Sequence, residues 1–142
     1  MTTRSKSGLA VSASALMTVS FAGYAYAAAA SIKVSDQKIF GNEVTVADVN
    51  LPKNGFLVIH PSDAKGNLIE KDIGHIALNA GDHKTVKVKL TENHKAGDKL
   101  WAMLHEDTGK AGVYEFGASG KTNVDMPFKE NGKAVEQAFK AL

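Results

Sequence analysis

Histidine and methionine side chains give this sequence its clearest capacity for metal chemistry. His60 and His105 each end an apolar run and enter a polar loop, and Met103 stands two residues before His105. Imidazole binds both zinc and copper, and a thioether can add a further ligand to copper. The sequence therefore predicts copper or zinc binding as one candidate activity. The candidate ligands are His60, His83, His94, His105 and Met103, with Met126 as a further thioether.

The expected strand arrangement limits which histidines can meet. His60 and His105 close two strands that we expect to be antiparallel neighbours, so the strand ends should lie at opposite ends of the domain. A strand of six residues spans roughly 20 Å, whereas each ligand must come within about 2 Å of a metal ion. We therefore expect His60 and His105 not to share a metal. His83 could instead meet His105, and His94 could meet His60. The competing role for each ring is to hydrogen-bond loop backbone at a strand end.

A second polar cluster follows the strand that contains His105. Glu106, Asp107 and Asp125 carry carboxylates that could bind calcium. Residues 107–112 lack the carboxylate count of an EF-hand loop, and Lys110 lies in the middle of them. We therefore predict a structural turn in which Asp107 accepts backbone N–H groups. Its expected members are Asp107, Gly109, Gly112 and Asp125, with the glycines supplying positive φ angles.

Other reactive chemistry has no recognisable setting in this chain. The sequence contains no Gly-x-Ser-x-Gly nucleophile elbow and no phosphate-binding glycine loop. It also contains no cysteine, which excludes a disulfide, a blue-copper site, a cysteine-bound zinc and an iron–sulfur cluster. We therefore expect a protein that is not an enzyme.

The apolar residues on Leu100–Leu104 indicate the strand around which the domain is built. Leu100, Ala102 and Leu104 lie on one side of it, and Trp101 and Met103 lie on the other. Because both sides are largely apolar, we expect this strand in the middle of a sheet. The remaining expected strands are Ser31–Asp36, Glu43–Val49, Phe56–His60, a broken edge strand over Leu68–Leu78 with a kink at Gly74, Thr85–Leu90 and Val113–Phe116.

These short strands, with a turn about every eight to twelve residues, predict the fold class. The pattern is typical of an all-β, immunoglobulin-like antiparallel β-sandwich of about seven strands. The C-terminal segment leaves two alternatives open. Val135, Ala138, Phe139 and Leu142 have the spacing of a short amphipathic helix, while Ala134–Phe139 could equally form a last edge strand.

The first 27 residues have the features of a secretory signal peptide. Arg4 and Lys6 precede an apolar segment, and Ala25-Tyr26-Ala27 is a cleavage site of the A-x-A type. Cleavage would leave residues 28–142 as a single domain. It would remove two of the 17 basic residues and none of the 15 acidic ones, so the mature charge is balanced. Nucleic acid and anionic membrane surfaces are therefore not expected partners.

Several stretches of the exported part resemble a known family. They are Ser35-Asp36-Gln37, residues 54–60 (NGFLVIH), residues 78–81 (LNAG), residues 100–116 (LWAMLHEDTGKAGVYEF) and Asp125-Met126-Pro127. The chain resembles secreted and cell-surface immunoglobulin-like β-sandwich domains of unknown function. This resemblance implies an extracytoplasmic location and supplies no catalytic residues.

Taken together, these features predict a periplasmic or secreted module that binds a partner or has a structural role. The expected partner is an envelope or extracellular protein or a glycan. The alternative is a periplasmic copper- or zinc-binding protein with histidine and methionine ligands.

Overall fold

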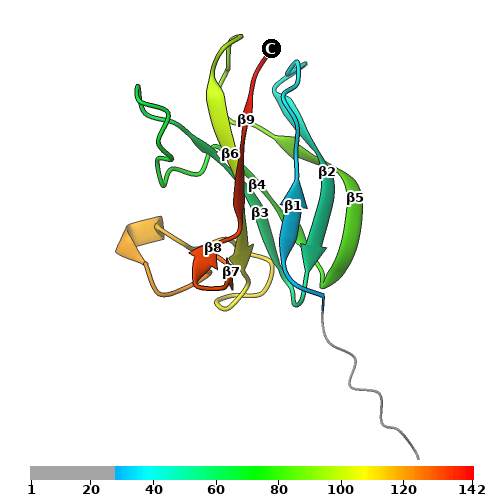
Figure 1. Cartoon of the computed structure of the whole chain (residues 1–142). Helices are drawn as coiled ribbons and strands as arrows, with labels where there is room; N and C mark the ends of the chain where they lie inside the picture. Colours follow the sequence, from blue (N-terminus) through cyan, green and yellow to red (C-terminus); the bar gives the residue numbers. More distant parts are fainter. Residues whose placement is uncertain (1–27) are drawn as a thin grey trace, which may run out of the picture.

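The computed structural model describes residues 28–142, which form two antiparallel β-sheets packed face to face (Figure 1). The signal peptide expected over residues 1–27 lies outside the described residues. The elements are β1 (Ser31–Lys33), β2 (Glu43–Leu51), β3 (Gly55–Pro61), β4 (Gly74–Leu78), β5 (Gly81–Lys89), β6 (Lys99–Glu106), the 3-10 turn η1 (Ala118–Gly120), β7 (Lys129–Glu130), β8 (Lys133–Ala134) and β9 (Glu136–Lys140).

The strand order confirms the predicted sandwich of seven principal strands. One sheet has the order β1-β2-β5 and the other β4-β3-β6-β9, while β7 and β8 form a separate two-residue pair. All strand pairs within these sheets are antiparallel. The order resembles that of immunoglobulin constant domains, except that the fourth strand joins the sheet of the third and sixth strands.

Apolar side chains that alternate along the strands fill the space between the sheets. Val44, Val46, Val86 and Val88 contribute from the three-stranded sheet, and Leu57, Ile59, Leu100, Ala102 and Leu104 contribute from the other. The expected alternation over 85–90 is confirmed, because Val86, Val88 and Leu90 are buried between exposed lysines. Burial of this continuous apolar surface is the main source of the fold's stability.

β3 and β6 are buried on both faces, as the sequence of β6 predicted. Phe56, Val58, Met103 and His105 point away from the inter-sheet core, and all four are nevertheless at most 5% exposed. The segment that covers them is the long connection after β6, here called the covering loop (residues 107–124), which lies at the lower left of Figure 1. The sheet therefore has a second buried layer outside the sandwich core.

One expected strand is wrong, one is shorter than expected, and the alternatives at the C-terminus are decided in favour of a strand. Of residues 68–78, only Gly74–Leu78 form a strand. Residues 113–116 form no strand and belong to the covering loop. The C-terminal segment is strand β9 and not a helix, because its alternate residues Phe139 and Ala141 are buried and the strand pairs with β6. The free edge of β6 requires a backbone partner, and this demand outweighs the helical spacing of Val135, Ala138 and Phe139.

The two ends of the described chain lie at opposite ends of the sandwich (Figure 1). Near the C-terminus, Gln37 and Ala141 form a parallel bridge. The Gln37 amide donates to the Lys140 carbonyl at 3.0 Å, and the Leu142 amide donates to the Gln37 carbonyl at 2.9 Å. No helix among residues 28–142 is long and apolar enough to cross a membrane.

Candidate functional site

Imidazole and aromatic rings gather on the outer face of the four-stranded sheet, beneath the covering loop. Adjacent rings in this cluster have centroids 5.1 to 6.2 Å apart. The members are Phe56 and His60 from β3, His75 from β4, His105 from β6, and Tyr114 and Phe116 from the covering loop. Three of the five histidines of the chain therefore lie in one cluster.

The expectation that His60 and His105 are too far apart to share a ligand is wrong. β3 and β6 are antiparallel neighbours as expected, but their register places Phe56 opposite His105 and Trp101 opposite His60. The two histidines are offset by four positions, or about 13 Å along the strands. The rings cover most of that distance, and their centroids are only 5.7 Å apart.

His60 and His105, here called the imidazole pair, are both held by backbone carbonyls. The Nδ1 atom of His60 lies 3.0 Å from the Lys71 carbonyl oxygen, and Nδ1 of His105 lies 2.7 Å from that of Asp125. A carbonyl only accepts, so each Nδ1 carries the proton and each Nε2 carries a lone pair. This confirms the backbone-bonding role for both rings. Nε2 of His60 has no hydrogen-bond partner, whereas Nε2 of His105 lies 3.4 Å from the Tyr114 hydroxyl.

Both members of the imidazole pair are neutral near pH 7. Burial is the largest cause in each case: it lowers the pKa of His60 and lowers the pKa of His105 to about 4. Neutral imidazole is also the form that binds metals.

Asp125, the residue that directly follows the covering loop, accepts several of the loop's backbone amides. Its side chain is fully buried, and its two carboxylate oxygens accept the backbone N–H groups of Thr108, Gly109 and Glu115 at 2.8 to 3.1 Å. Its own amide donates to the Thr108 hydroxyl at 2.9 Å. Because its carbonyl also holds His105, Asp125 connects the conformation of the loop to the orientation of the imidazole pair.

The expected structural turn forms, with one change of role. Asp107 accepts the Gly112 amide at 2.7 Å, and Gly112 has a φ of +74°. Gly109 does not have a positive φ; it is needed because a Cβ there would collide with the side chains of Glu115 and Val124. Both oxygens of Asp125 and Oδ2 of Asp107 thus accept loop backbone amides, while Oδ1 of Asp107 is buried without a partner.

Sequence reasoning did not single out His75 and Tyr114 as site residues. His75 Nδ1 lies 2.6 Å from the Asp72 carboxylate, and this hydrogen bond raises the pKa of His75. Burial raises the pKa of Tyr114, whose hydroxyl lies 3.4 Å from both ring nitrogens of His105. Tyr114 follows a glycine-rich turn, which could have marked it as a loop residue. The apolar residues at 113–116 instead favoured a strand.

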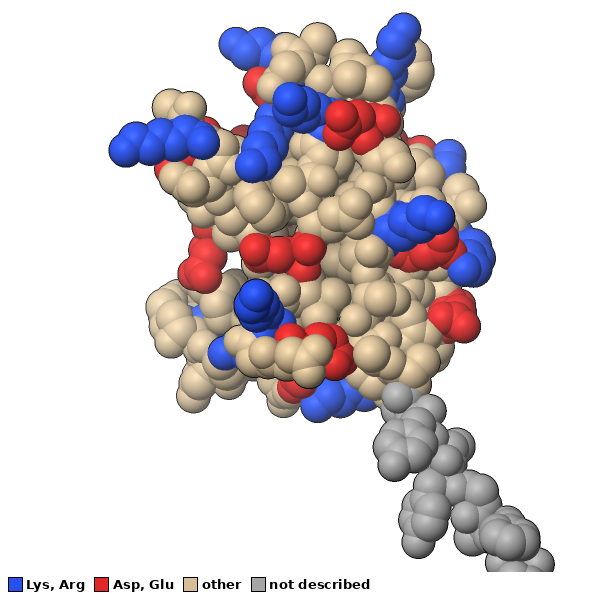
Figure 2. Space-filling view, in the orientation of Figure 1, with Lys and Arg blue, Asp and Glu red and all other residues tan. Residues whose placement is uncertain are grey.

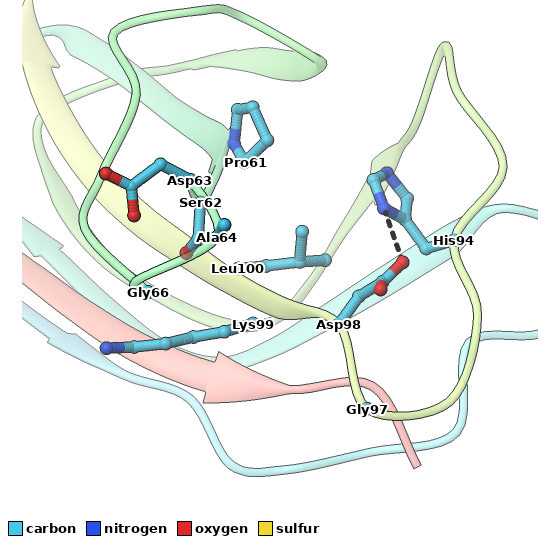
Figure 3. A pocket seen from close by; sticks show the side chains of 10 residues that line it. All are labelled: Pro61, Ser62, Asp63, Ala64, Gly66, His94, Gly97, Asp98, Lys99 and Leu100. Carbon is cyan, nitrogen blue, oxygen red and sulfur yellow. Dashed lines mark ion pairs between the residues drawn. The ribbon is translucent and has the colours of Figure 1, made fainter.

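The other two candidate histidines belong to different parts of the molecule. His83 lies on β5 in the three-stranded sheet, where its Nε2 contacts the Asn79 carbonyl oxygen at 2.7 Å. His94 lines a shallow pocket between two loops and points toward Asp98, with 3.7 Å between Nδ1 and the carboxylate (Figure 3). The carboxylate of Asp63 in the same pocket accepts the backbone amides of Lys65 and Asn67. Among residues 28–142, no three histidine, cysteine, aspartate or glutamate side chains come together as metal ligands.

The charged surface is mixed rather than segregated. Lysines and carboxylates alternate over the face shown in Figure 2. Several form ion pairs, including Lys53–Glu106 at 3.1 Å and Lys87–Glu43 at 2.9 Å. Trp101 lies on a strand that we expected in the middle of a sheet with both sides apolar, but it is partly exposed on the outer face and donates its indole N–H to Ser62 at 2.9 Å.

Comparisons with known proteins define the class of this chain. The family model for the domain of unknown function DUF7282 matches residues 30–141. Two curated relatives, cell surface glycoproteins 1 and 2 of Haloarcula hispanica, are each 32% identical over 106 residues, which is 75% of this chain. The matched region is only 11% of the length of each glycoprotein. No solved structure gives a significant match.

The protein is therefore a β-sandwich domain related to archaeal cell surface glycoproteins. It belongs to the DUF7282 family, which covers nearly all of the described residues.

Proposed function

We propose that this protein is an exported, non-enzymatic β-sandwich module that acts outside the cytoplasm by binding a partner or by a structural role in the cell envelope. The observation that carries this proposal is the match over 106 residues to two proteins named as cell surface glycoproteins. The signal-peptide pattern over residues 1–27 supports export independently of that match.

A passive role is supported by how the polar groups of the domain are used. The buried carboxylate of Asp125 accepts three backbone amides, and Asp63 accepts two in an exposed turn. Catalysis requires a nucleophile or base placed beside groups that stabilise developing charge. In the described residues these carboxylates serve the backbone of their own loops.

The partner that fits best is an envelope or extracellular protein or a glycan. The balanced charge of residues 28–142 and the interleaved surface charges in Figure 2 give little attraction for polyanions. Partial exposure of Trp101 beside Lys99 adds one aromatic surface group, with the Lys99 Nζ atom 4.6 Å from the indole centroid.

Export is tested by expressing the full chain in its producing organism and determining the N-terminus of the accumulated protein by mass spectrometry. We expect an N-terminus at Ala28 or within the following alanines, and loss of the protein when intact cells are treated with protease. Ala25→Leu, which disrupts the cleavage site, should cause the precursor to accumulate. Accumulation of uncleaved protein that intact cells protect from protease would contradict the proposal.

A further inference from the structure

We propose that His60, His105 and Met103 form a buried site for monovalent copper beneath the covering loop. This inference concerns the interior of the domain, and it stands independently of where the protein acts or what its surface binds.

The separation of the two rings fits a shared metal ion. An imidazole nitrogen ligates a first-row metal at about 2 Å, which places the metal about 3.2 Å from the ring centre. Two rings on one ion therefore have centres at most about 6.4 Å apart. The centroids of His60 and His105 are 5.7 Å apart, with an angle of 39° between the ring planes. Both side chains are at most 1% exposed.

The hydrogen bonds of the imidazole pair match those of metal-bound histidines. Ligating histidines donate their second ring N–H to a carboxylate, a backbone carbonyl or water, which fixes the tautomer. Here the carbonyls of Lys71 and Asp125 hold the two Nδ1 atoms. Nε2 of His60 is buried and has no hydrogen-bond partner. A buried lone pair without a partner is unusual in a folded protein, and a metal ion would satisfy it.

Met103 is the third ligand because of its position in the sheet. It lies opposite Val58, between the two histidines in register, and it shares the outer face of β6 with His105. It is therefore a diagonal neighbour of His60 and two residues from His105, within reach of a long side chain in both directions. Its side chain is only 5% exposed and is not part of the inter-sheet core.

The chemistry of this donor set selects copper in its monovalent state. Two imidazoles and a thioether are all neutral, and thioether sulfur is a soft ligand that favours Cu(I). The carboxylates of Asp72 and Asp125, which act on His105 electrostatically, are bonded to His75 and to loop amides and are not part of this donor set.

The covering loop provides an access path for the ion. A shallow pocket whose lining includes Glu70, Lys71, Asp72, Tyr114 and Phe116 opens on the surface beside the cluster. Tyr114 and Phe116 both contact the His105 ring, with centroids 5.1 Å away. A small outward displacement of these two rings would expose His105 to the pocket.

Titration of Cu(I) into residues 28–142, without oxygen and in competition with a chromophoric chelator, tests the proposal. We expect one equivalent to bind, and X-ray absorption should show two nitrogen ligands and one sulfur ligand. In nitrogen-15 spectra the Nε2 signals of two of the five histidines, His60 and His105, should shift. Absence of Cu(I) binding, or shifts confined to His75, His83 or His94, would overturn the site.

Variants then assign the ligands. Met103→Leu keeps an apolar side chain of similar volume and should lower Cu(I) affinity at least tenfold while removing the sulfur signal. His60→Gln and His105→Gln should abolish tight binding, whereas the matched control His83→Gln should leave it unchanged. If the histidine variants unfold, the Met103→Leu comparison and the spectra of the wild-type protein still decide. Unchanged affinity and an unchanged sulfur signal in Met103→Leu would remove Met103 from the site.

Discussion

The ion pair between His75 and Asp72 is the residue-scale feature most sensitive to pH. Their hydrogen bond raises the pKa of His75. Burial opposes ionisation of Asp72, but the hydrogen bonds from His75 and from the Gly74 amide outweigh it and keep the pKa of this carboxyl below its usual value. The pair therefore contributes stability only while both groups are charged.

The sign of each shift sets the pH window. Because the folded pKa of His75 is raised, its contribution is complete below the unfolded value of 6.5 and is lost as pH rises through the folded value. The pKa of Asp72 is lowered in the folded protein. Its contribution to stability is therefore complete above the unfolded pKa of 3.8 and is lost as pH falls through the folded pKa. We therefore expect the largest coupling free energy between Asp72 and His75 from about pH 3.8 to pH 6.5, where both groups are charged.

A double-mutant cycle with His75→Gln and Asp72→Asn measures this coupling. We expect a coupling free energy of at most about 1 kcal/mol near pH 5.5, because both side chains are partly exposed, and a value near zero at pH 9. The Lys53–Glu106 pair, at 3.1 Å, is the matched control because it contains no histidine. A His75–Asp72 coupling that stays constant from pH 5.5 to pH 9 would show that the pair does not act electrostatically.

At the same scale, sequence reasoning identified the residues of the candidate site but not their arrangement. His60, Met103 and His105 were named because they end or flank apolar runs. Their proximity depends on the register of β3 against β6 and on rotamers that bring the two imidazole rings toward each other. Neither register nor rotamer is encoded by spacing along one strand.

At the scale of elements, the covering loop is stable because one buried carboxylate satisfies several of its amides. Asp125→Ala would leave the N–H groups of Thr108, Gly109 and Glu115 without their acceptor. We expect a loss of about 1–3 kcal/mol in the free energy of unfolding. The same three amides should exchange faster with solvent deuterium.

Asp63→Ala is the matched control for this change. Asp63 also accepts backbone amides, from Lys65 and Asn67, but it is exposed, so water can replace it. We expect Asp63→Ala to lower the free energy of unfolding by well under half as much as Asp125→Ala. Equal losses in the two variants, measured by urea unfolding, would show that burial of Asp125 has no special importance.

Elements with a strong local pattern were predictable, and elements defined by distant partners were not. The apolar run of β3 gave a strand of the right type and close to the right bounds, and the alternation over 85–90 gave a strand whose observed start, Gly81, lies four residues earlier. Residues 113–116 look like a strand locally, but Glu115 donates its amide to Asp125 and no neighbouring strand pairs with them. β9 depends in the same way on the free edge of β6.

At the scale of the whole molecule, the first and last segments of the described chain run side by side in the same direction. The bridge between Gln37 and Ala141 is parallel, whereas the ends of residues 28–142 leave the sandwich at opposite ends. The amides of Gln37 and Leu142 make the two hydrogen bonds of this contact.

This geometry determines how the domain responds to a mechanical load. A force applied between residues 28 and 142 pulls the two segments past each other, so both hydrogen bonds are sheared together. A force applied between residues 95 and 142 acts at one end of the antiparallel β6–β9 pair and peels β9 away bond by bond. Single-molecule pulling should therefore require clearly more force in the first direction. Equal rupture forces would refute this, and a difference would make the domain a link that resists stretching along a longer chain.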